Sequence, residues 1–135
     1  CSAEDSEKMF DELLKNKEEI MQSLKLPYRL TELCTGDLSR WKARQNEVEV
    51  WRPTTKAYGE VGSLSNCTDY QTRGLNIRYD GKDGRKVVHA LNNTAVATSR
   101  ILVAIVENYQ QKDGSIKVPD VLVPYMHGIK VLKKK

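Results

Sequence analysis

Apolar residues recur at helical intervals over residues 2–25 and alternate with polar ones further along the chain. One face of this first segment collects Met9, Phe10, Leu13, Leu14, Ile20, Met21 and Leu24. The opposite face is rich in Lys and Glu, so the pattern predicts an amphipathic helix with a solvated charged face. Ser2 and Asp5 have the spacing of a capping box, and Pro27 ends the helix.

The middle of the chain has the two-residue alternation of strands. Three strands are expected in the first half, at residues 28–34, 47–51 and 57–64, and a hairpin turn at 54–56 joins the last two. Two more strands are expected on either side of the turn signal 80–84, at residues 75–79 and 86–91. A short helix at 68–73, capped by Thr68, separates the two groups.

A long, mainly apolar helix is predicted from about Thr94 to Gln110. A turn at 113–114 and a short segment at 118–126 follow it. The connections between the strands are too short for crossovers, which favours antiparallel pairing. The order of elements therefore predicts an α+β domain in which an antiparallel β-sheet is flanked by helices.

Composition excludes several classes of protein. The chain has 135 residues, 39% of them apolar and 30% charged, so it is typical of a globular domain rather than a disordered segment. Three widely spaced cysteines, none in a CxxC pair, argue against a disulfide framework or a zinc ribbon and for a reducing compartment. No run of 18 apolar residues exists, so no membrane-spanning segment is expected. The net charge of +4 is concentrated in the tail at 130–135, which we interpret as a solvated tail.

Arg100 stands out near the beginning of the apolar helix. From Ala95 to Val106 only residues 98–100 are polar, so the helix is expected to be buried and the guanidinium to need an anionic partner. The residues leave two partners open: a protein carboxylate, for which Glu60 is a candidate, or a phosphate or carboxylate of a ligand. Asn93, seven residues earlier, is expected on the same helical face.

A second polar group lies on the expected strand at 57–64. Glu60, Gly62 and Leu64 should share one face of it, and Ser63 is adjacent in the sequence. A carboxylate beside a hydroxyl can bind Mg²⁺ together with phosphates, although a solvated glutamate on an edge strand would have the same pattern. His89 is expected to be a core residue of its strand, since it has no Cys or His partner at metal-ligand spacing.

Taken together and in this order, several stretches resemble the seryl-tRNA synthetases, in the C-terminal half of their class II catalytic domain. The stretches are 26–30, 34–38, 48–51, 65–71, 75–79 and 89–100, continued by 107–110, 113–114 and 118–119. Residues 92–107 match class II motif 3. The resemblance covers about residues 1–126 and assigns 1–135 to this half-domain, with motifs 1 and 2 and the N-terminal tRNA-binding arm outside it.

The resemblance implies ATP-dependent activation of serine to seryl-adenylate and transfer of the seryl group to tRNA(Ser). Arg100 would be the catalytic arginine that holds the γ-phosphate, and Glu60 and Ser63 would bind the Mg²⁺ that bridges the phosphates. The ATP-contacting set would be Glu60, Val61, Gly62, Ser63 and Arg100. Asn92 and Thr94 would read the seryl hydroxyl group.

The resemblance also implies a homodimer in the full-length protein, in the cytoplasm or alternatively in the mitochondrial matrix. The 135 residues alone are expected to be inactive. Three glycines depart from the family pattern, at Gly59, Gly62 and Gly74. An alternative is a synthetase-like paralogue with a binding or regulatory role and no aminoacylation. A nucleic-acid-binding module built on the Lys-rich tail is less favoured, because no aromatic residues are interleaved with the basic ones.

Overall fold

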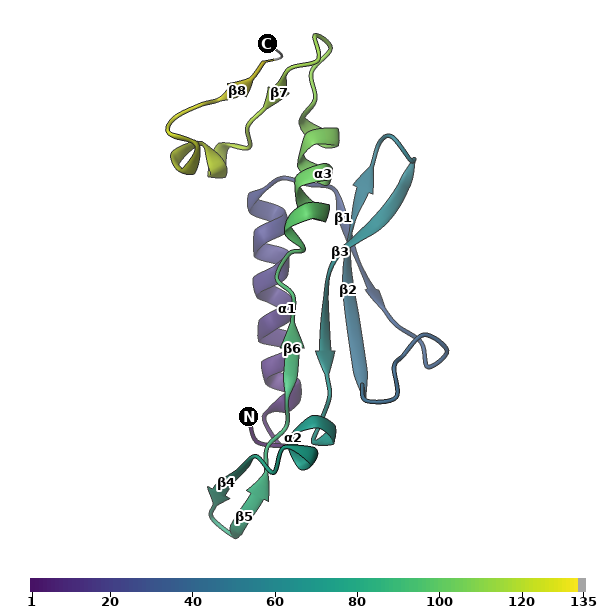
Figure 1. The fold of residues 1–135 in the computed structure, drawn as a ribbon, viewed down its shortest axis with the longest axis vertical. Helices are drawn as coiled ribbons and strands as arrows, with labels where there is room; N and C mark the ends of the chain where they lie inside the picture. Colours follow the sequence, from purple (N-terminus) through teal and green to yellow (C-terminus); the bar gives the residue numbers. More distant parts are fainter. Residues whose placement is uncertain (134–135) are drawn as a thin grey trace.

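The computed structural model of the protein describes residues 1–133 (Figure 1). A helix, a group of strands and a second long helix follow one another, as predicted. The elements are α1 (Ser6–Ser23), β1 (Tyr28–Glu32), β2 (Arg44–Arg52), β3 (Ala57–Asn66), α2 (Tyr70–Gly74), β4 (Arg78–Gly81), β5 (Gly84–Val87), β6 (Leu91–Asn93), α3 (Thr98–Tyr109), β7 (Ile116–Lys117), η1 (Asp120–Met126, a 3₁₀ helix) and β8 (Val131–Leu132).

The main sheet has four strands in the order β1-β2-β3-β6, and every neighbouring pair is antiparallel. The long β2–β3 hairpin forms its centre and turns at 53–56. Two small hairpins, β4–β5 and β7–β8, lie outside this sheet. The expected α+β class, an antiparallel sheet flanked by helices, is confirmed.

Both long helices cover the same face of the sheet, which we call the inner face (Figure 1). The buried cluster between helices and sheet contains Met21, Leu24, Leu26, Val48, Val50, Val61, Ile101 and Ala104. The alternation of β2 explains this division, because its inward valines alternate with glutamates on the outer face. Residues 1–133 contain no helix that is long and apolar enough to cross a membrane.

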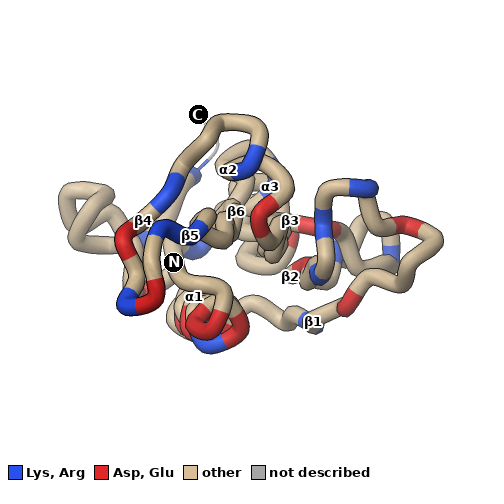
Figure 2. Tube along the Cα trace, turned by 90° about the horizontal axis from the view of Figure 1, so that it is seen from below, with Lys and Arg blue, Asp and Glu red and all other residues tan. Residues whose placement is uncertain are grey.

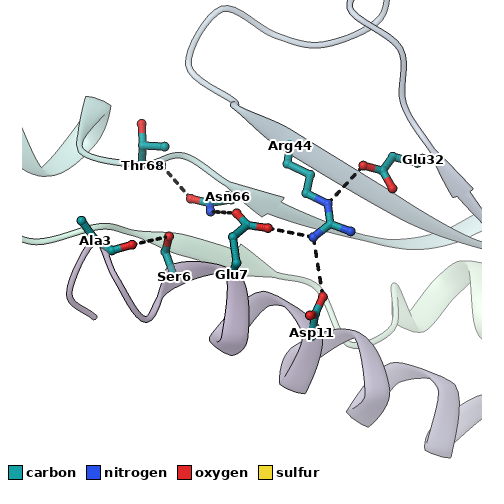
Figure 3. A network of polar contacts seen from close by, with 8 residues as sticks. All are labelled: Ala3, Ser6, Glu7, Asp11, Glu32, Arg44, Asn66 and Thr68. Carbon is teal, nitrogen blue, oxygen red and sulfur yellow. Dashed lines mark hydrogen bonds and ion pairs between the residues drawn. The ribbon is translucent and has the colours of Figure 1, made fainter.

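An ionic network fixes the first half of α1 to the sheet (Figure 3). The Arg44 guanidinium donates to Glu7 at 2.9 Å and to Glu32 at 3.1 Å, and it lies 4.2 Å above the centre of the Phe10 ring. The other oxygen of Glu7 accepts a 2.8 Å hydrogen bond from Asn66, at the end of β3. One arginine on β2 therefore joins α1 to three strands.

Several predicted boundaries are wrong. The predicted strand at 86–91 is two strands, of which β5 pairs with β4 and β6 pairs with β3. Helix α3 begins at Thr98 instead of Thr94, because the backbone N–H groups of residues 94 and 97 bond to β3 instead of starting the helix. Thr68 does not cap α2: it has a φ of 46°, and Asp69 precedes the helix. His89 lies between strands and is only half-buried, rather than in the core.

Lys17 interrupts the apolar face of α1. The prediction that the charged residues of this helix are all solvated is therefore wrong for Lys17. Its side chain is completely buried between those of Phe10 and Met21 along the helix, and its Nζ has no hydrogen-bond partner among residues 1–133. Burial lowers the pKa of the Lys17 ammonium group from 10.5 to about 8, although the negative charges of Glu60 and Glu47 oppose the change. The protein therefore carries a poorly solvated cation under its sheet.

We predict that Lys17→Met raises the free energy of unfolding at neutral pH. The charged form is disfavoured in the folded state, so its cost is fully present below pH 8 and is lost as the pH rises from 8 to 10.5. At about 1.4 kcal/mol per pKa unit, the cost near pH 7 is about 3 kcal/mol. Urea unfolding of both proteins would check this, with an advantage about 2 kcal/mol smaller at pH 10. An advantage independent of pH would contradict it.

Candidate functional site

The edge of β3 is the element that assembles the site. Strand β6 pairs with β3 only at its last three residues, Leu64 to Asn66. Beyond this point the chain continues along the same edge, where the Thr94 N–H donates to the Ser63 carbonyl at 2.9 Å and the Ala97 N–H to the Val61 carbonyl at 2.6 Å. The next donor is a side chain, since Arg100 Nη1 lies 3.3 Å from the Glu60 carbonyl.

Gly62 allows this close approach. A Cβ added at position 62 would lie 2.5 Å from the Thr94 carbonyl oxygen and 3.3 Å from that of Ala95. Both atoms belong to the main chain and cannot rotate away. The glycine that departs from the expected family pattern is therefore required by the path of residues 94–97 in this protein.

Glu60 and Arg100 meet in one cavity. The cavity has a volume of about 360 Å³ and is lined by Arg52, Gly59, Glu60, Val61 and Arg100. Arg100 Nη1 lies 2.5 Å from Glu60 Oε2, so of the two partners left open by the sequence, the protein carboxylate is the one present here. The remaining donors of the guanidinium fork point to no other carboxylate among the described ion pairs.

The expectation of a buried helix around Arg100 is wrong. The Arg100 side chain is 55% exposed and that of Glu60 33% exposed. Leu102, two residues further along, is also exposed, and only Ile101 and Ala104 of α3 are buried. The ion pair therefore lies at an accessible cavity mouth, where its net contribution to stability is small.

A β-bulge determines which side chains lie on the same face of the sheet as Glu60. The register of β2 and β3 shifts between Val48 and Glu49, so that Gly62 lies opposite Val48 but Glu60 lies opposite Glu49. Residues directly opposite each other share a face. Glu60 therefore lies on the outer face and Gly62 on the inner face, which corrects the expectation that they share one.

The same bulge brings Ser63 to the face of Glu60. Ser63 lies opposite Glu47, whose carboxylate is also on the outer face. Burial raises the pKa of the Glu47 carboxyl, and the nearby charge of Glu60 adds to the rise. The carboxylate and hydroxyl oxygens in this region are the ligand types that Mg²⁺ prefers, so the residue types fit that ion. No cluster of three metal-binding side chains occurs within residues 1–133.

The two asparagines of the motif 3 stretch, Asn92 and Asn93, lie on opposite faces of the sheet. Asn92 lies opposite Ser65 and is exposed on the outer face, whereas Asn93 lies opposite Leu64 and turns inward. Asn93 is in β6 and not in α3, so it does not share a helical face with Arg100 as expected. Thr94 is exposed and is held by its own N–H against Ser63.

Arg52 is the cavity residue that the sequence did not reveal. It ends β2 opposite Ala57, and its Nη2 lies 2.5 Å from Glu107 Oε1 on α3. The Arg52 guanidinium lowers the pKa of the Glu107 carboxyl, which also accepts a hydrogen bond from the Thr54 N–H. The only indication of Arg52 in the sequence was its place at the end of a strand in which valines and glutamates alternate, and this pattern does not predict a binding site.

Comparison with known proteins defines the class to which this fold and site belong. Residues 1–109 match the model of the tRNA synthetase class II core domain (G, H, P, S and T), and the chain belongs to this family. Within it, the most specific likeness is to serine–tRNA ligases. The chain is 51% identical over 126 residues to the enzyme named serine–tRNA ligase of Picrophilus torridus, covering 93% of this chain and 28% of that protein. It is 52% identical over 136 residues to the serine–tRNA ligase of Dictyoglomus thermophilum, covering 100% of this chain and 32% of that protein.

Solved structures agree with these relatives. The crystal structure of seryl-tRNA synthetase from Pyrococcus horikoshii complexed with ATP superposes with a TM-score of 0.94 at 43% identity, covering all of this chain and 30% of that one. The crystal structure of cytoplasmic serine–tRNA ligase from Naegleria fowleri in complex with AMP superposes with a TM-score of 0.89 at 45% identity, covering 96% of this chain and 31% of that one. The resemblance to seryl-tRNA synthetases is confirmed. The chain spans about a third of the length of the curated relatives that it matches.

We predict that Gly62→Ala lowers the free energy of unfolding by about 1–3 kcal/mol, the usual cost of an extra carbon in a packed site. The methyl group would push residues 94–97 away from β3. Gly74→Ala is the matched control, because a Cβ there meets no heavy atom within 4 Å and alanine favours the helix more than glycine does. Chemical denaturation of the three proteins checks this, and equal effects of the two substitutions would argue against the close contact.

Proposed function

We propose that the full-length protein containing this chain is a serine–tRNA ligase, which activates serine with ATP and transfers it to tRNA(Ser). The pairing of Glu60 and Arg100 in one accessible cavity carries the proposal. Relatives named serine–tRNA ligase at about half identity, and similar structures that hold ATP or AMP, support it.

Arg100 is the catalytic group in this proposal, and it binds the γ-phosphate of ATP. An exposed guanidinium that uses one nitrogen for Glu60 retains donors for phosphate oxygens, and its planar fork matches them. Val61, Gly62 and Ser63 would approach the nucleotide from the strand, since Val61 also lines the cavity. The serine carboxylate is the nucleophile, so these groups contribute by positioning and by stabilising charge.

Glu60 and Ser63 would hold Mg²⁺ beside the phosphates. Their common place on the outer face, which also carries the Glu47 carboxyl opposite Ser63, supports a cation there. When bound, the ion supplies neutralisation of phosphate charge. Glu60 then serves two partners, because its carboxylate already orients Arg100.

Asn92 and Thr94 would recognise the serine substrate. Both are exposed, and Asn92 is on the outer face beside Ser65. A hydroxyl and an amide are suited to bond the seryl hydroxyl group, and a site built this way rejects amino acids that lack it. The main-chain bond from Thr94 to Ser63 ties this pair to the ATP-binding strand.

The wider assignments depend on the same family membership. We propose a homodimer, with motifs 1 and 2 and the tRNA-binding arm in other parts of the full-length protein and no activity in residues 1–135 alone. Three free cysteines support a reducing compartment, which we propose is the cytoplasm, with the mitochondrial matrix as the alternative.

The competing functions are less well supported. A paralogue without catalysis would not need Glu60, Thr94 and Arg100 intact, and a motif 2 arginine upstream of Cys1 would decide for the enzyme. A general nucleic-acid-binding module requires a basic face, but Figure 2 shows Lys and Arg interspersed with Asp and Glu along α1 and the β4–β5 hairpin. The end of the Lys-rich tail, residues 134–135, lies outside the described residues.

We predict that Arg100→Met in the full-length protein lowers the rate of ATP–pyrophosphate exchange about 100- to 1000-fold, through lost charge stabilisation of the transition state. The free energy of unfolding should change by less than about 1 kcal/mol, because the pair with Glu60 is exposed. Exchange kinetics and the urea midpoint on one variant check both parts. Near-normal exchange with a large fall in the midpoint would make Arg100 a structural residue.

We predict that Thr94→Ala raises the Michaelis constant for serine about tenfold, the effect of losing one hydrogen bond, with little change for ATP. Thr94→Ser keeps the hydroxyl and serves as the matched control, with near-normal constants for both substrates. Steady-state exchange kinetics at varied serine and ATP would measure them. Equal changes for the two substrates in Thr94→Ala would count against a serine-reading role.

A further inference from the structure

Arg52 opens into the same cavity as Arg100. It lies on β2, whereas Arg100 belongs to α3, and the cavity lining contains both guanidinium groups with Glu60 as the only carboxylate residue. The lining therefore has a formal charge of +1. The Arg52 side chain crosses Gly59, where an added Cβ would lie 3.3 Å from Arg52 Cδ. Glycine at 59 leaves the space that Arg52 occupies.

The hydrogen-bonding capacity of Arg52 is largely unused. Its Nη2 is bonded to Glu107, while its Nε is buried and has no partner among residues 1–133. A guanidinium has five N–H donors, and a buried donor without a partner is costly. The side chain remains 36% exposed, so an anion entering the cavity can reach it.

Helix α3 holds the two guanidinium groups in a fixed relation. Arg100 and Glu107 are seven residues apart, two turns along one face of the helix. Arg100 contacts Glu60 on β3, and Glu107 contacts Arg52 on β2, so two ion pairs connect α3 to neighbouring strands. Glu107 thereby restricts Arg52 to a rotamer that lines the cavity.

We propose that Arg52 is a second phosphate-binding residue, which contacts the terminal phosphates of the nucleotide alongside Arg100. The inference rests on the proposed function, since it deepens the ATP site of a serine–tRNA ligase. Two forks from different elements provide a cradle for an anion with more than one phosphate group, and charge-assisted bonds to phosphate are among the strongest available. The cavity therefore favours ATP over AMP through Arg52 as well as Arg100.

A purely structural role makes a different forecast. If Arg52 only fastens α3 to β2 through Glu107, its loss would loosen the helix. Binding of every nucleotide would then weaken together with the stability of the fold. A phosphate contact instead affects only ligands that carry the terminal phosphates. The ratio of ATP to AMP affinity is thus a readout that a structural role would not change.

The test is calorimetric titration of full-length wild type, Arg52→Met and Arg100→Met with ATP and with AMP. We expect Arg52→Met to weaken ATP binding about tenfold, which corresponds to one charge-assisted contact, and AMP binding less than about twofold. Arg73→Met is the matched control. Arg73 lies on α2, outside the cavity, and like Arg52 it is paired with a carboxylate, that of Asp69. Arg52→Lys keeps the charge beside Glu107 but loses the fork, so it should weaken ATP binding about threefold and covers the case in which Arg52→Met does not fold.

Each outcome separates the inference from the proposed function. Weaker ATP binding in Arg100→Met with normal binding in both Arg52 variants would overturn the inference and leave the function standing. Parallel losses for ATP and AMP with a lower urea midpoint would assign Arg52 to structure and also overturn it. Wild-type protein that does not bind ATP would overturn the proposed function and the inference with it.

Discussion

The unpaired edge of β3 is the constraint on which the site depends. Its carbonyl groups need donors, and the chain after β6 supplies them at Ser63 and Val61 through two main-chain N–H groups. The arginine guanidinium then meets the carbonyl and the carboxylate of Glu60. Arg100 is therefore positioned by the pairing of residues 94–97 with a strand, together with the packing of Ile101 and Ala104 in the core.

The two faces of the sheet have separate tasks. The inner face packs valines against α1 and α3, while the outer face carries glutamates, Ser63 and Asn92. The bulge at Val48–Glu49 lets one strand serve both, because it places Glu60 and Ser63 on the outer face although they are three residues apart. Groups held by a sheet and a helix are placed more precisely than groups on loops, as phosphate chemistry requires.

The sequence predicted what local periodicity determines, including α1, the β2–β3 hairpin and the α+β class. It did not predict the start of α3, because the mainly apolar residues 94–97 read as its first turn and are kept out of the helix only by pairing with β3. The bulge between β2 and β3 could not be predicted from the sequence, since the register of a strand depends on its partner strand. The pair of Glu60 and Arg100 was foreseen as one of two alternatives, whereas Arg52 was missed because only the packing of β2 against α3 brings it to the cavity.

Residue-resolved hydrogen exchange in the full-length protein tests most directly whether pairing along β3 positions Arg100. If it does, the amides of Thr94 and Ala97 exchange slowly, at rates approaching those of α3, because their hydrogen bonds to Ser63 and Val61 open only when this segment leaves the sheet. The amides of Lys82 and Asp83, in the exposed β4–β5 turn, provide the fast reference. Exchange of Thr94 and Ala97 as fast as that reference would contradict the account.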